Sequence, residues 1–268
     1  MLTKPVQVSG SRQDEIMLRV LAQRTVRIRE LALEFAVSEM TIRRELDHLA
    51  ELGQIERIHG GARLREHAAE EESYQQRSLV QASAKDRMAL AALELVQNGD
   101  SVGLDASTSA LALARILPAR RVRAILTGLD SVEAVMNSPI DFFVCGGFFH
   151  AKARSFVGAT AIESLSRLHP DKVFFSSGGF TVEDGFTDPN PQEADTKRAL
   201  LKGGSLKIAL IDHTKIGRRA LASTAKLNEI DVLITDRQPS RELREALERE
   251  DVRLIVNEDP SQHCHESD

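Results

Sequence analysis

Short polar groups stand directly after apolar runs in the larger, C-terminal part of the sequence. Residues 105–109 (DASTS) follow one such run and open a helical pattern. Hydroxyl groups and the free N–H groups of a helix N-terminus together form a site for an anion such as phosphate. Asp212 and Lys215 follow another run and offer a carboxylate and a cation. The pattern predicts a binding site for a phosphorylated molecule.

Three more apolar runs end in small or hydroxyl residues, at Thr127-Gly128, at Gly146-Gly147 and at residues 177–179 (SGG). A hydroxyl at a helix start is also an ordinary N-cap, and a glycine pair is an ordinary turn, so each group alone has a purely structural explanation. Ligands of open α/β sheets bind beyond the carboxyl ends of the strands. Five such strand ends in one sheet favour the ligand site.

The stretch 185–198 (GFTDPNPQEADTKR) adds charge to this predicted site. Its prolines exclude a helix before Pro191, which itself suits an early helical position. Glu193 and Lys197 would then lie four residues apart on a helix, the spacing of an intrahelical salt bridge. The alternative interpretation directs Glu193 to sugar hydroxyls and a basic neighbour to phosphate. The spacing alone allows both.

A different chemistry is indicated near the N-terminus. Apolar residues recur at helical spacing over residues 39–52, with Ser38 at the N-cap and residues 36–38 as a short joint to a preceding helix, as in a helix-turn-helix. This periodicity turns five side chains outward: Met40, Thr41, Arg43, Arg44 and Asp47. Arginines on such a helix contact guanine edges or phosphates in the major groove. A solvated face of an ordinary helical hairpin is the alternative.

Residues 54–64 (QIERIHGGARL) follow this pattern and decide between the two interpretations. Apolar residues alternate there, and Gly60-Gly61 supplies a turn, so the segment predicts a short β-ribbon or wing. Residues 1–65 also hold 11 of the 35 Lys and Arg residues but only 9 of the 40 Asp and Glu residues. A mildly basic head with a short joint and a wing favours DNA binding.

Length and composition limit the remaining possibilities. A chain of 268 residues with 42% hydrophobic and 28% charged residues is globular and long enough for two domains. No apolar run reaches the roughly 20 residues of a membrane span, and residues 1–10 lack the apolar core of a secretory signal. Only two cysteines occur, which fits a reducing cytosol. We therefore expect a cytoplasmic protein.

Alternating β-rich and helical patterns predict an α/β domain with a largely parallel sheet after the head. The predicted strands are 101–104, 122–126, 142–145, 173–176, 206–211, 232–235 and 253–256. The predicted helices are 12–23, 28–36 and 39–52 in the head, then 85–96, 109–117, 131–137, 160–168, 191–201 and 240–248. We divide the chain into a DNA-binding domain (11–65), a partly helical linker (66–78), a sensing domain (79–258) and a polar tail (259–268).

Residues 12–64 resemble the winged helix-turn-helix of the DeoR family of bacterial transcription regulators. The resemblance rests on Arg12, Ile16 and Val20 in the first helix and on residues 57–62 (RIHGGA) in the wing. In the third helix it rests on Ser38, Thr41, Ile42, Arg43, Arg44 and Leu46. Glu45 departs from the family, which usually has Asp there. The resemblance implies a helix-turn-helix from Val26 to Glu45. It implies DNA contacts at Val26, Ser38, Met40, Thr41, Arg43, Arg44, Arg57, His59, Gly60 and Gly61.

Residues 79–236 resemble the sensor domain of the same family, which is similar in fold to ribose-5-phosphate isomerase and CoA-transferase-like proteins. The supporting segments are 99–109, 145–147, 156–158, 185–198, 212–217 and 234–236. The resemblance implies a phosphorylated sugar or polyol as effector, in contact with Asp105, Ser107, Thr108, Ser109, Thr127, Gly146, Gly147, Glu193 and Lys215. The family's usual Asp-x-Gly-Ser/Thr-Thr and Thr-Asn stand here as DASTS and as Thr127-Gly128.

A phosphosugar isomerase is the rival function, with Asp105, Glu193, Asp212 and Lys215 as acid–base and electrostatic groups. A stand-alone isomerase has no use for a DNA-binding head, so we expect no enzyme activity. The run His263-Cys264-His265 is too compact to form a tetrahedral metal site by itself, and Cys145 is predicted to be a buried small residue. No cofactor and no metal is expected.

The sequence therefore predicts a transcription regulator, specifically a repressor of a carbohydrate or polyol operon. Its expected partners are double-stranded operator DNA, a phosphorylated sugar or polyol, and further copies of itself. A dimer or tetramer is expected because a single head offers few contacts to DNA. No membrane partner is expected.

Overall fold

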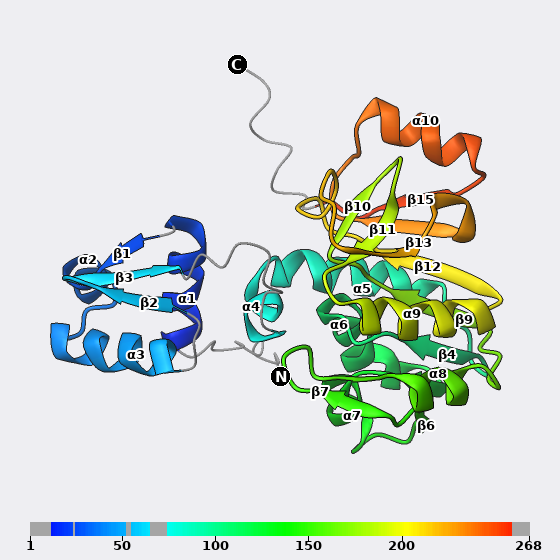
Figure 1. Ribbon diagram of the computed structural model, residues 1–268, viewed down its shortest axis with the longest axis horizontal. Helices are drawn as coiled ribbons and strands as arrows, with labels where there is room; N and C mark the ends of the chain where they lie inside the picture. The colour runs from blue at the N-terminus through cyan, green and yellow to red at the C-terminus, as the bar shows by residue number, and fades with distance from the viewer. Residues whose placement is uncertain (1–11, 24, 52–54, 65–73, 259–268) are drawn as a thin grey trace, which may run out of the picture. The chain divides into compact units, whose positions relative to one another are not determined.

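The computed structural model describes residues 12–23, 25–51, 55–64 and 74–258. These residues form two compact units, Met1–Val80 and Gln81–Asp268, which we call the head unit and the sensor unit. Figure 1 shows the helices and strands of both units in chain order, and each unit is treated by itself below.

In its described residues the head unit contains three helices and a three-stranded antiparallel sheet, followed by one further helix. Its elements are α1 (Arg12–Gln23), β1 (Thr25–Arg27), α2 (Ile28–Glu34), α3 (Glu39–Glu51), β2 (Ile55–Ile58), β3 (Gly61–Leu64) and α4 (Tyr74–Leu79). The sheet order is β1-β3-β2, and β2 and β3 form the predicted wing. The short strand β1 was not expected. Gly53, which follows the helical pattern of residues 39–52 in the sequence, lies outside the described residues.

The joint between α2 and α3 is held by local hydrogen bonds. The backbone N–H of Val37 donates to the Ala32 carbonyl at 3.0 Å, and Ala36 adopts a left-handed conformation with φ of 51°. Ser38 caps α3 as predicted, because its Oγ accepts from the Thr41 N–H at 3.2 Å. Ile42 and Leu46 of α3 are fully buried in the head core.

The sensor unit is built on a seven-stranded parallel sheet, as predicted. Its strands are β4 (Ser101–Leu104), β5 (Arg123–Leu126), β6 (Asp141–Val144), β9 (Lys172–Phe175), β12 (Leu206–Leu210), β14 (Val232–Thr235) and β15 (Arg253–Val256). The order is β15-β14-β12-β9-β4-β5-β6, and every neighbouring pair is parallel. All seven predicted strands are therefore confirmed, with ends that differ by one residue at most.

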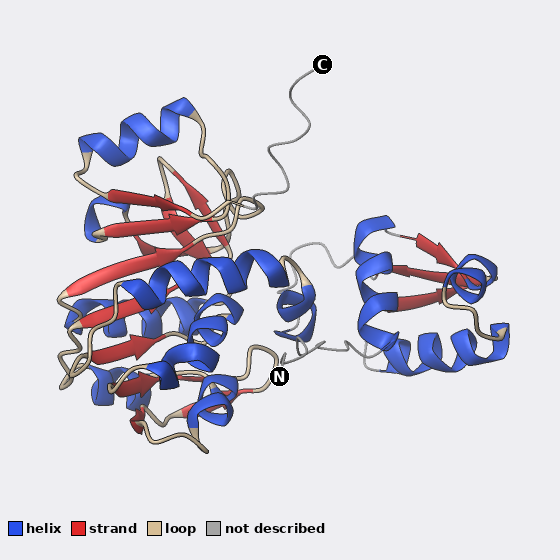
Figure 2. Ribbon diagram, turned by 180° about the vertical axis from the view of Figure 1, so that it is seen from behind, coloured by secondary structure: helices blue, strands red, loops and turns tan. Residues whose placement is uncertain are grey.

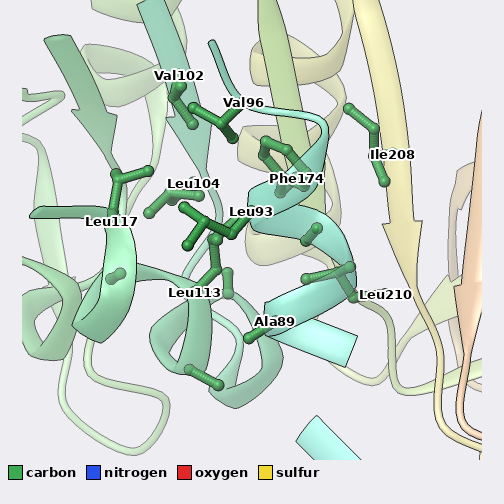
Figure 3. Close-up of a cluster of buried hydrophobic side chains, with 14 of the residues drawn as sticks. Ala89, Leu93, Val96, Val102, Leu104, Leu113, Leu117, Phe174, Ile208 and Leu210 are labelled. Atoms are coloured by element: carbon green, nitrogen blue, oxygen red, sulfur yellow. The ribbon is translucent and has the colours of Figure 1, made fainter. Parts of the chain in front are cut away.

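Helices cover both faces of this sheet (Figure 2). One buried cluster contains side chains of α5 (Ala82–Glu94), α6 (Thr108–Ile116) and α7 (Leu129–Val135). The other contains side chains of α8 (Ala159–Leu165), α9 (Pro191–Gly203) and α10 (Arg241–Arg249). Side chains alternate between the two faces along each strand, so Phe174 joins the first cluster and Phe175 the second. Figure 3 shows Phe174 with Leu93, Leu113 and Leu210 in the first cluster.

Short antiparallel strands at the carboxyl end of the sheet were not predicted. β10 (Gly179–Thr181), β11 (Gly185–Asp188) and β13 (Ala222–Ala225) form one sheet. β7 (Phe148–His150) and β8 (Ser155–Val157) form a hairpin. Each run is only three or four residues long and lies between turn residues, so it carries too little alternation to be recognised in the sequence.

We expect Leu46→Ala to lower the free energy of unfolding of the head unit by about 2–5 kcal/mol, because it leaves a cavity where a fully buried side chain packed. Hydrogen exchange of the α3 amides, followed by mass spectrometry, measures the loss. Leu33→Ala is the matched control, since Leu33 on α2 is 83% exposed, and its effect should stay within about 0.5 kcal/mol. Equal effects of the two substitutions would contradict the assigned core.

Candidate functional site

The N-terminal half of α3 presents a polar, cationic surface. Met40 is 59% exposed, the Arg43 side chain is 52% exposed, and Arg44 is exposed as well. Arg43 lies 3.7 Å from Glu39 one turn earlier, a loose pairing that leaves its guanidinium at the surface. Thr41 is half-buried and shares a hydrogen bond of 2.9 Å with Ser38. The outward face predicted for this helix is thus present.

Three of the residues assigned to DNA contacts have structural roles in the head unit. Val26 is 1% exposed in the head core, so its side chain supports the fold. A Cβ at Gly61 would lie 2.0 Å from the Val26 carbonyl oxygen, so this glycine permits β1 and β3 to approach. Arg57 pairs with Asp47 of α3 at 2.9 Å and donates to the Gly61 carbonyl at 2.6 Å. It ties the wing to α3.

The remaining wing residues are at the surface. His59 and Gly60 are exposed at the turn between β2 and β3, and Gly60 has a positive φ of 78°, which a side chain would strain.

The departure at Glu45 is compatible with a salt bridge. Arg12 donates to Glu45 Oε1 from Nε at 2.8 Å and from a terminal nitrogen at 2.5 Å, which fastens α1 to α3.

The polar strand ends of the sensor unit meet at one edge of the sheet. Because β4, β5, β6, β9 and β12 are all parallel, the residues that follow them lie at the same carboxyl edge. The chain passes from β4 to β5 and β6 on one side, and β9, β12, β14 and β15 fill the other. The reversal of strand order between β4 and β9 is the place where ligands bind in open α/β sheets.

Lys197 on α9 is the centre of a buried cluster at this reversal. Its Nζ lies 2.9 Å from Asp188 Oδ2 and 3.2 Å from Asp105 Oδ2, and it donates to the Ser176 carbonyl at 2.5 Å. The three charged side chains are at most 9% exposed. Burial by itself would lower the pKa of Lys197, but the charges of Asp188 and Asp105 outweigh it and raise the pKa. The ammonium group is therefore firmly protonated.

This cluster bears on two expectations about the site. The salt bridge suggested by the spacing of Glu193 and Lys197 does not form, since Lys197 pairs with Asp105 and Asp188. Asp105 is 1% exposed and accepts from the Ser107 hydroxyl at 2.5 Å and the Ser176 N–H at 3.1 Å. Its carboxylate is held by protein groups and orients its neighbours. Sequence reasoning missed Asp188 and Ser176, which lie in a short strand and a strand end.

A second cation lies close to the first. Lys215 Nζ donates to the Ser176 hydroxyl at 2.7 Å and lies 3.6 Å from Asp212 Oδ2. Burial would raise the pKa of Asp212, but Lys215, the Thr214 hydroxyl and Lys85 outweigh it and hold the pKa below its ordinary value. Ser176 thus links both lysines, through its carbonyl oxygen to Lys197 and through its hydroxyl to Lys215.

The hydroxyl residues at the start of α6 are buried. Ser107 caps the helix, with its Oγ accepting from the Ala110 N–H at 3.0 Å, so it has the ordinary capping role. Thr108 is 6% exposed and Thr127, after β5, is 4% exposed. Ser109 is fully buried, and its Oγ has no hydrogen-bond partner among the described residues. A buried hydroxyl without a partner at a helix N-terminus is a group that a ligand can satisfy.

The β7–β8 hairpin lies against the end of β5 and contacts Glu193. The Phe156 N–H donates to the Thr127 carbonyl at 2.8 Å. Ser155 donates to Glu193 Oε1 at 2.5 Å, and His150 Nδ1 lies 3.7 Å from the same oxygen. Glu193 is therefore positioned by a segment that the sequence did not identify, and its side chain is 10% exposed.

The glycines of the site approach protein backbone. A Cβ at Gly147 would lie 2.7 Å from the Val157 carbonyl oxygen, so this glycine permits a close approach to β8. Gly146 has open space at its Cβ position and a φ of 66°. A Cβ at Gly128 would lie 2.8 Å from Ala106 Cα. This contact gives the departure at Gly128 a steric reason, because the loops after β4 and β5 touch here.

A histidine beside the cluster also escaped sequence reasoning. His213 follows β12, and its ring Nδ1 lies 2.8 Å from Asp236 Oδ2. The backbone N–H of His213 donates to the other oxygen of the same carboxylate, Oδ1, at 2.6 Å. The Asp236 side chain is 2% exposed. The neighbouring strand ends of β12 and β14 supply the pair, so only the strand order brings the two residues together.

The sequence also led to predictions for Cys145 and for the run His263-Cys264-His265. Cys145 is 2% exposed, and burial raises the pKa of its thiol to about 12, which makes it unreactive. His263, Cys264 and His265 lie outside the described residues. Within the described residues no cluster of His, Cys, Asp or Glu is arranged to hold a metal ion, and no helix is long and apolar enough to cross a membrane.

Comparison with known families assigns both parts of the chain. Residues 12–68 match the DeoR-like helix-turn-helix domain, and residues 80–237 match the DeoR C terminal sensor domain. The two matches meet near the boundary between the head unit and the sensor unit.

Similar proteins cover nearly the whole chain. The HTH-type transcriptional regulator GolR of Listeria innocua is 34% identical over 87% of this chain and 92% of its own length. The HTH-type transcriptional repressor GlcR of Bacillus subtilis is 34% identical over 83% and 86%. The L-fucose operon activator of Haemophilus influenzae is 29% identical over 91% and 99%. Ribose 5-phosphate isomerase A of Methanocaldococcus jannaschii superimposes on half of the chain with a TM-score of 0.39 and 15% identity, covering 54% of that structure.

We expect Lys197→Met to destabilise the sensor unit by about 3–5 kcal/mol, because it leaves two buried carboxylates without their cation. Chemical denaturation followed by circular dichroism measures the change. Arg198→Met is the matched control on the next residue, whose side chain is 48% exposed, and it should change stability by about 0.5 kcal/mol or less. A stable Lys197→Met protein would remove Lys197 from the centre of the site.

Proposed function

The chain belongs to the DeoR family of transcription regulators, and from this premise we propose that it represses a carbohydrate or polyol operon under the control of a phosphorylated sugar. The observation that carries the proposal is the combination of an exposed cationic helix face in the head unit with a buried cationic cluster at the ligand-binding edge of the sensor unit. The repressor role is the one that the name of GlcR states for that protein.

Operator binding is proposed for the N-terminal half of α3 and for the wing turn. Ser38, Met40, Thr41, Arg43 and Arg44 would enter the major groove, where the free N–H groups of the helix also attract phosphate. His59 and Gly60 would lie beside the duplex at the exposed turn. A protein that binds operator DNA acts where the DNA is, so the proposal includes a cytoplasmic location.

Arg43→Ala and Arg44→Ala should each weaken specific operator binding by about 1–3 kcal/mol per head, through the loss of a guanine or phosphate contact. Titration of the DNA upstream of the chain's own gene, followed by gel shift at fixed salt, measures the loss. Arg241→Ala is the control, because Arg241 is an 87% exposed arginine of the sensor unit. Unchanged affinity of both α3 variants would refute the assigned recognition helix.

Effector binding is proposed at the strand reversal, with the phosphate at the start of α6. The Ser109 hydroxyl is buried and has no hydrogen-bond partner among the described residues, Thr108 and Thr127 add hydroxyls, and Lys215 supplies a positive charge. Glu193, held by Ser155, would accept hydrogen bonds from sugar hydroxyls. Asp105 acts here through Lys197 and Ser107, and Gly146 leaves open space beside the site.

The same groups support binding without turnover. Asp105 and Asp188 are occupied by Lys197, and Glu193 accepts from Ser155, so each carboxylate is held by a fixed partner. Effector binding can control the heads only through different affinities for two arrangements of the protein. We therefore propose a sensor that reports a metabolite and does not convert it.

Thr108→Glu places a carboxylate where the phosphate would bind, so like charge should exclude the effector while operator binding survives. A thermal-shift screen with phosphorylated sugars identifies a ligand, since a ligand at 100 times its Kd adds about 2.7 kcal/mol of stability. Thr160→Glu is the control, because Thr160 is an exposed residue in the first turn of α8. Normal ligand stabilisation of Thr108→Glu would place the phosphate elsewhere.

A further inference from the structure

Exposed phenylalanines gather in one segment of the sensor unit. Four of the ten phenylalanines of the chain are exposed, and they lie between residues 142 and 149. Phe142 is 38% exposed, Phe143 43%, Phe148 68% and Phe149 37%. A concentration of apolar side chains in one exposed segment marks an interaction surface, whereas scattered exposed side chains have no such meaning.

The first two phenylalanines belong to β6, the last strand of the parallel sheet (Figure 1). Within the described part of the chain, β6 pairs with β5 alone, so its outer edge offers unpaired backbone groups. Phe142 lies in register with Ala124, and Phe143 with Ile125. Ala124 and Ile125 belong to the two buried clusters on opposite faces of the sheet. Both hydrophobic layers therefore end in an exposed phenylalanine at this edge.

A hollow lies beside this edge, at the amino ends of the strands and away from the proposed effector site. It has a volume of about 360 Å³ and is lined by Ile125, Phe143 and Leu168, with Arg123, Asp141 and His169 among its polar residues. The hollow and the exposed edge are continuous, because Phe142 and Phe143 line both. Beyond β6 an apolar partner would extend both layers of the core.

An open edge strand is normally protected by lysine, proline, a bulge or a covering segment. β6 has the sequence DFFV and carries only one charged side chain, Asp141, at its first residue. Without such protection an exposed apolar edge pairs with other strands, so we expect that another strand covers the edge of β6. A second β6 fits, since two copies related by a two-fold axis pair antiparallel and bring the same phenylalanines together from both sides.

The size of the exposed surface agrees with a second copy. With about 200 Å² for a phenylalanine side chain, the four exposed fractions correspond to roughly 350–400 Å² of aromatic surface per copy. Phe142 and Phe143 of β6 account for about 160 Å² of it, and a standard interface takes roughly 800 Å² from each partner, so the β7 hairpin and other residues of the edge would supply the rest. Helix-turn-helix regulators also bind DNA as dimers on paired half-sites. We infer that the β6 edge, with Phe142 and Phe143 at its centre, is the surface through which two copies of this chain associate.

The experiment compares the mass of the full-length chain with that of Phe143→Glu by sedimentation equilibrium. The wild type should contain two or more copies, and Phe143→Glu should weaken their association at least 100-fold, because it opposes like charges at the two-fold axis. Leu221→Glu is the matched control on an exposed side chain of the same unit, 78% exposed and outside the segment. It should leave the mass unchanged, and circular dichroism of all three proteins should agree.

A cysteine cross-link tests the strand pairing directly. Unlike Phe143→Glu, it does not rely on weakening the association. A chain that carries Phe142→Cys and Phe143→Cys together, with Cys264→Ser, should form an intermolecular disulfide on mild oxidation. Leu221→Cys in the same background should not. A monomeric wild type, an unchanged mass of Phe143→Glu, or the absence of the cross-link would each overturn the inference. Neither measurement involves operator DNA or a sugar phosphate, so the proposed function is tested separately.

Discussion

The buried ammonium group of Lys197 is the constraint on which the carboxyl edge of the sensor unit depends. A charge removed from water must be met by opposite charge and hydrogen bonds, and here Asp105, Asp188 and the Ser176 carbonyl meet it from β4, β11 and the end of β9. Four elements are thereby fixed at one point, including α9, which carries Lys197 itself. The cap of α6 is joined to this cluster, because Asp105 also accepts from the Ser107 hydroxyl.

The cluster also separates two kinds of residue that the sequence presents alike. Asp105 and Thr108 are both polar and lie three residues apart, yet the Asp105 carboxylate is fully occupied by protein groups. Ser109, in contrast, has a buried hydroxyl without a partner among the described residues. A residue can thus be essential to a binding site by holding a charge in place, while its neighbour is suited to contact the ligand.

The head unit follows a different physical plan. Its small apolar core, built around Ile42 and Leu46, leaves the opposite face of α3 to charged residues. Ion pairs at the surface join the elements, with Arg12 on Glu45 between two helices and Arg57 on Asp47 between the wing and α3. Such exposed pairs contribute little stability each, but they define the orientation of the wing relative to the helix that we propose to enter the major groove.

The sequence by itself determined the elements with strong periodicity and the order in which they occur. The stripe of α3, the cap at Ser38 and the seven strands of the parallel sheet were all recognisable, because hydrophobic spacing of 2.0 or 3.6 residues is a local property. Only the tertiary structure decided which residues meet. Asp188 and Lys197 pair across an irregular loop, His213 meets Asp236 because β12 and β14 are neighbours, and Val26 lies in the core. These contacts depend on strand order and on the burial of charge, and neither can be predicted from the spacing of residues along the sequence.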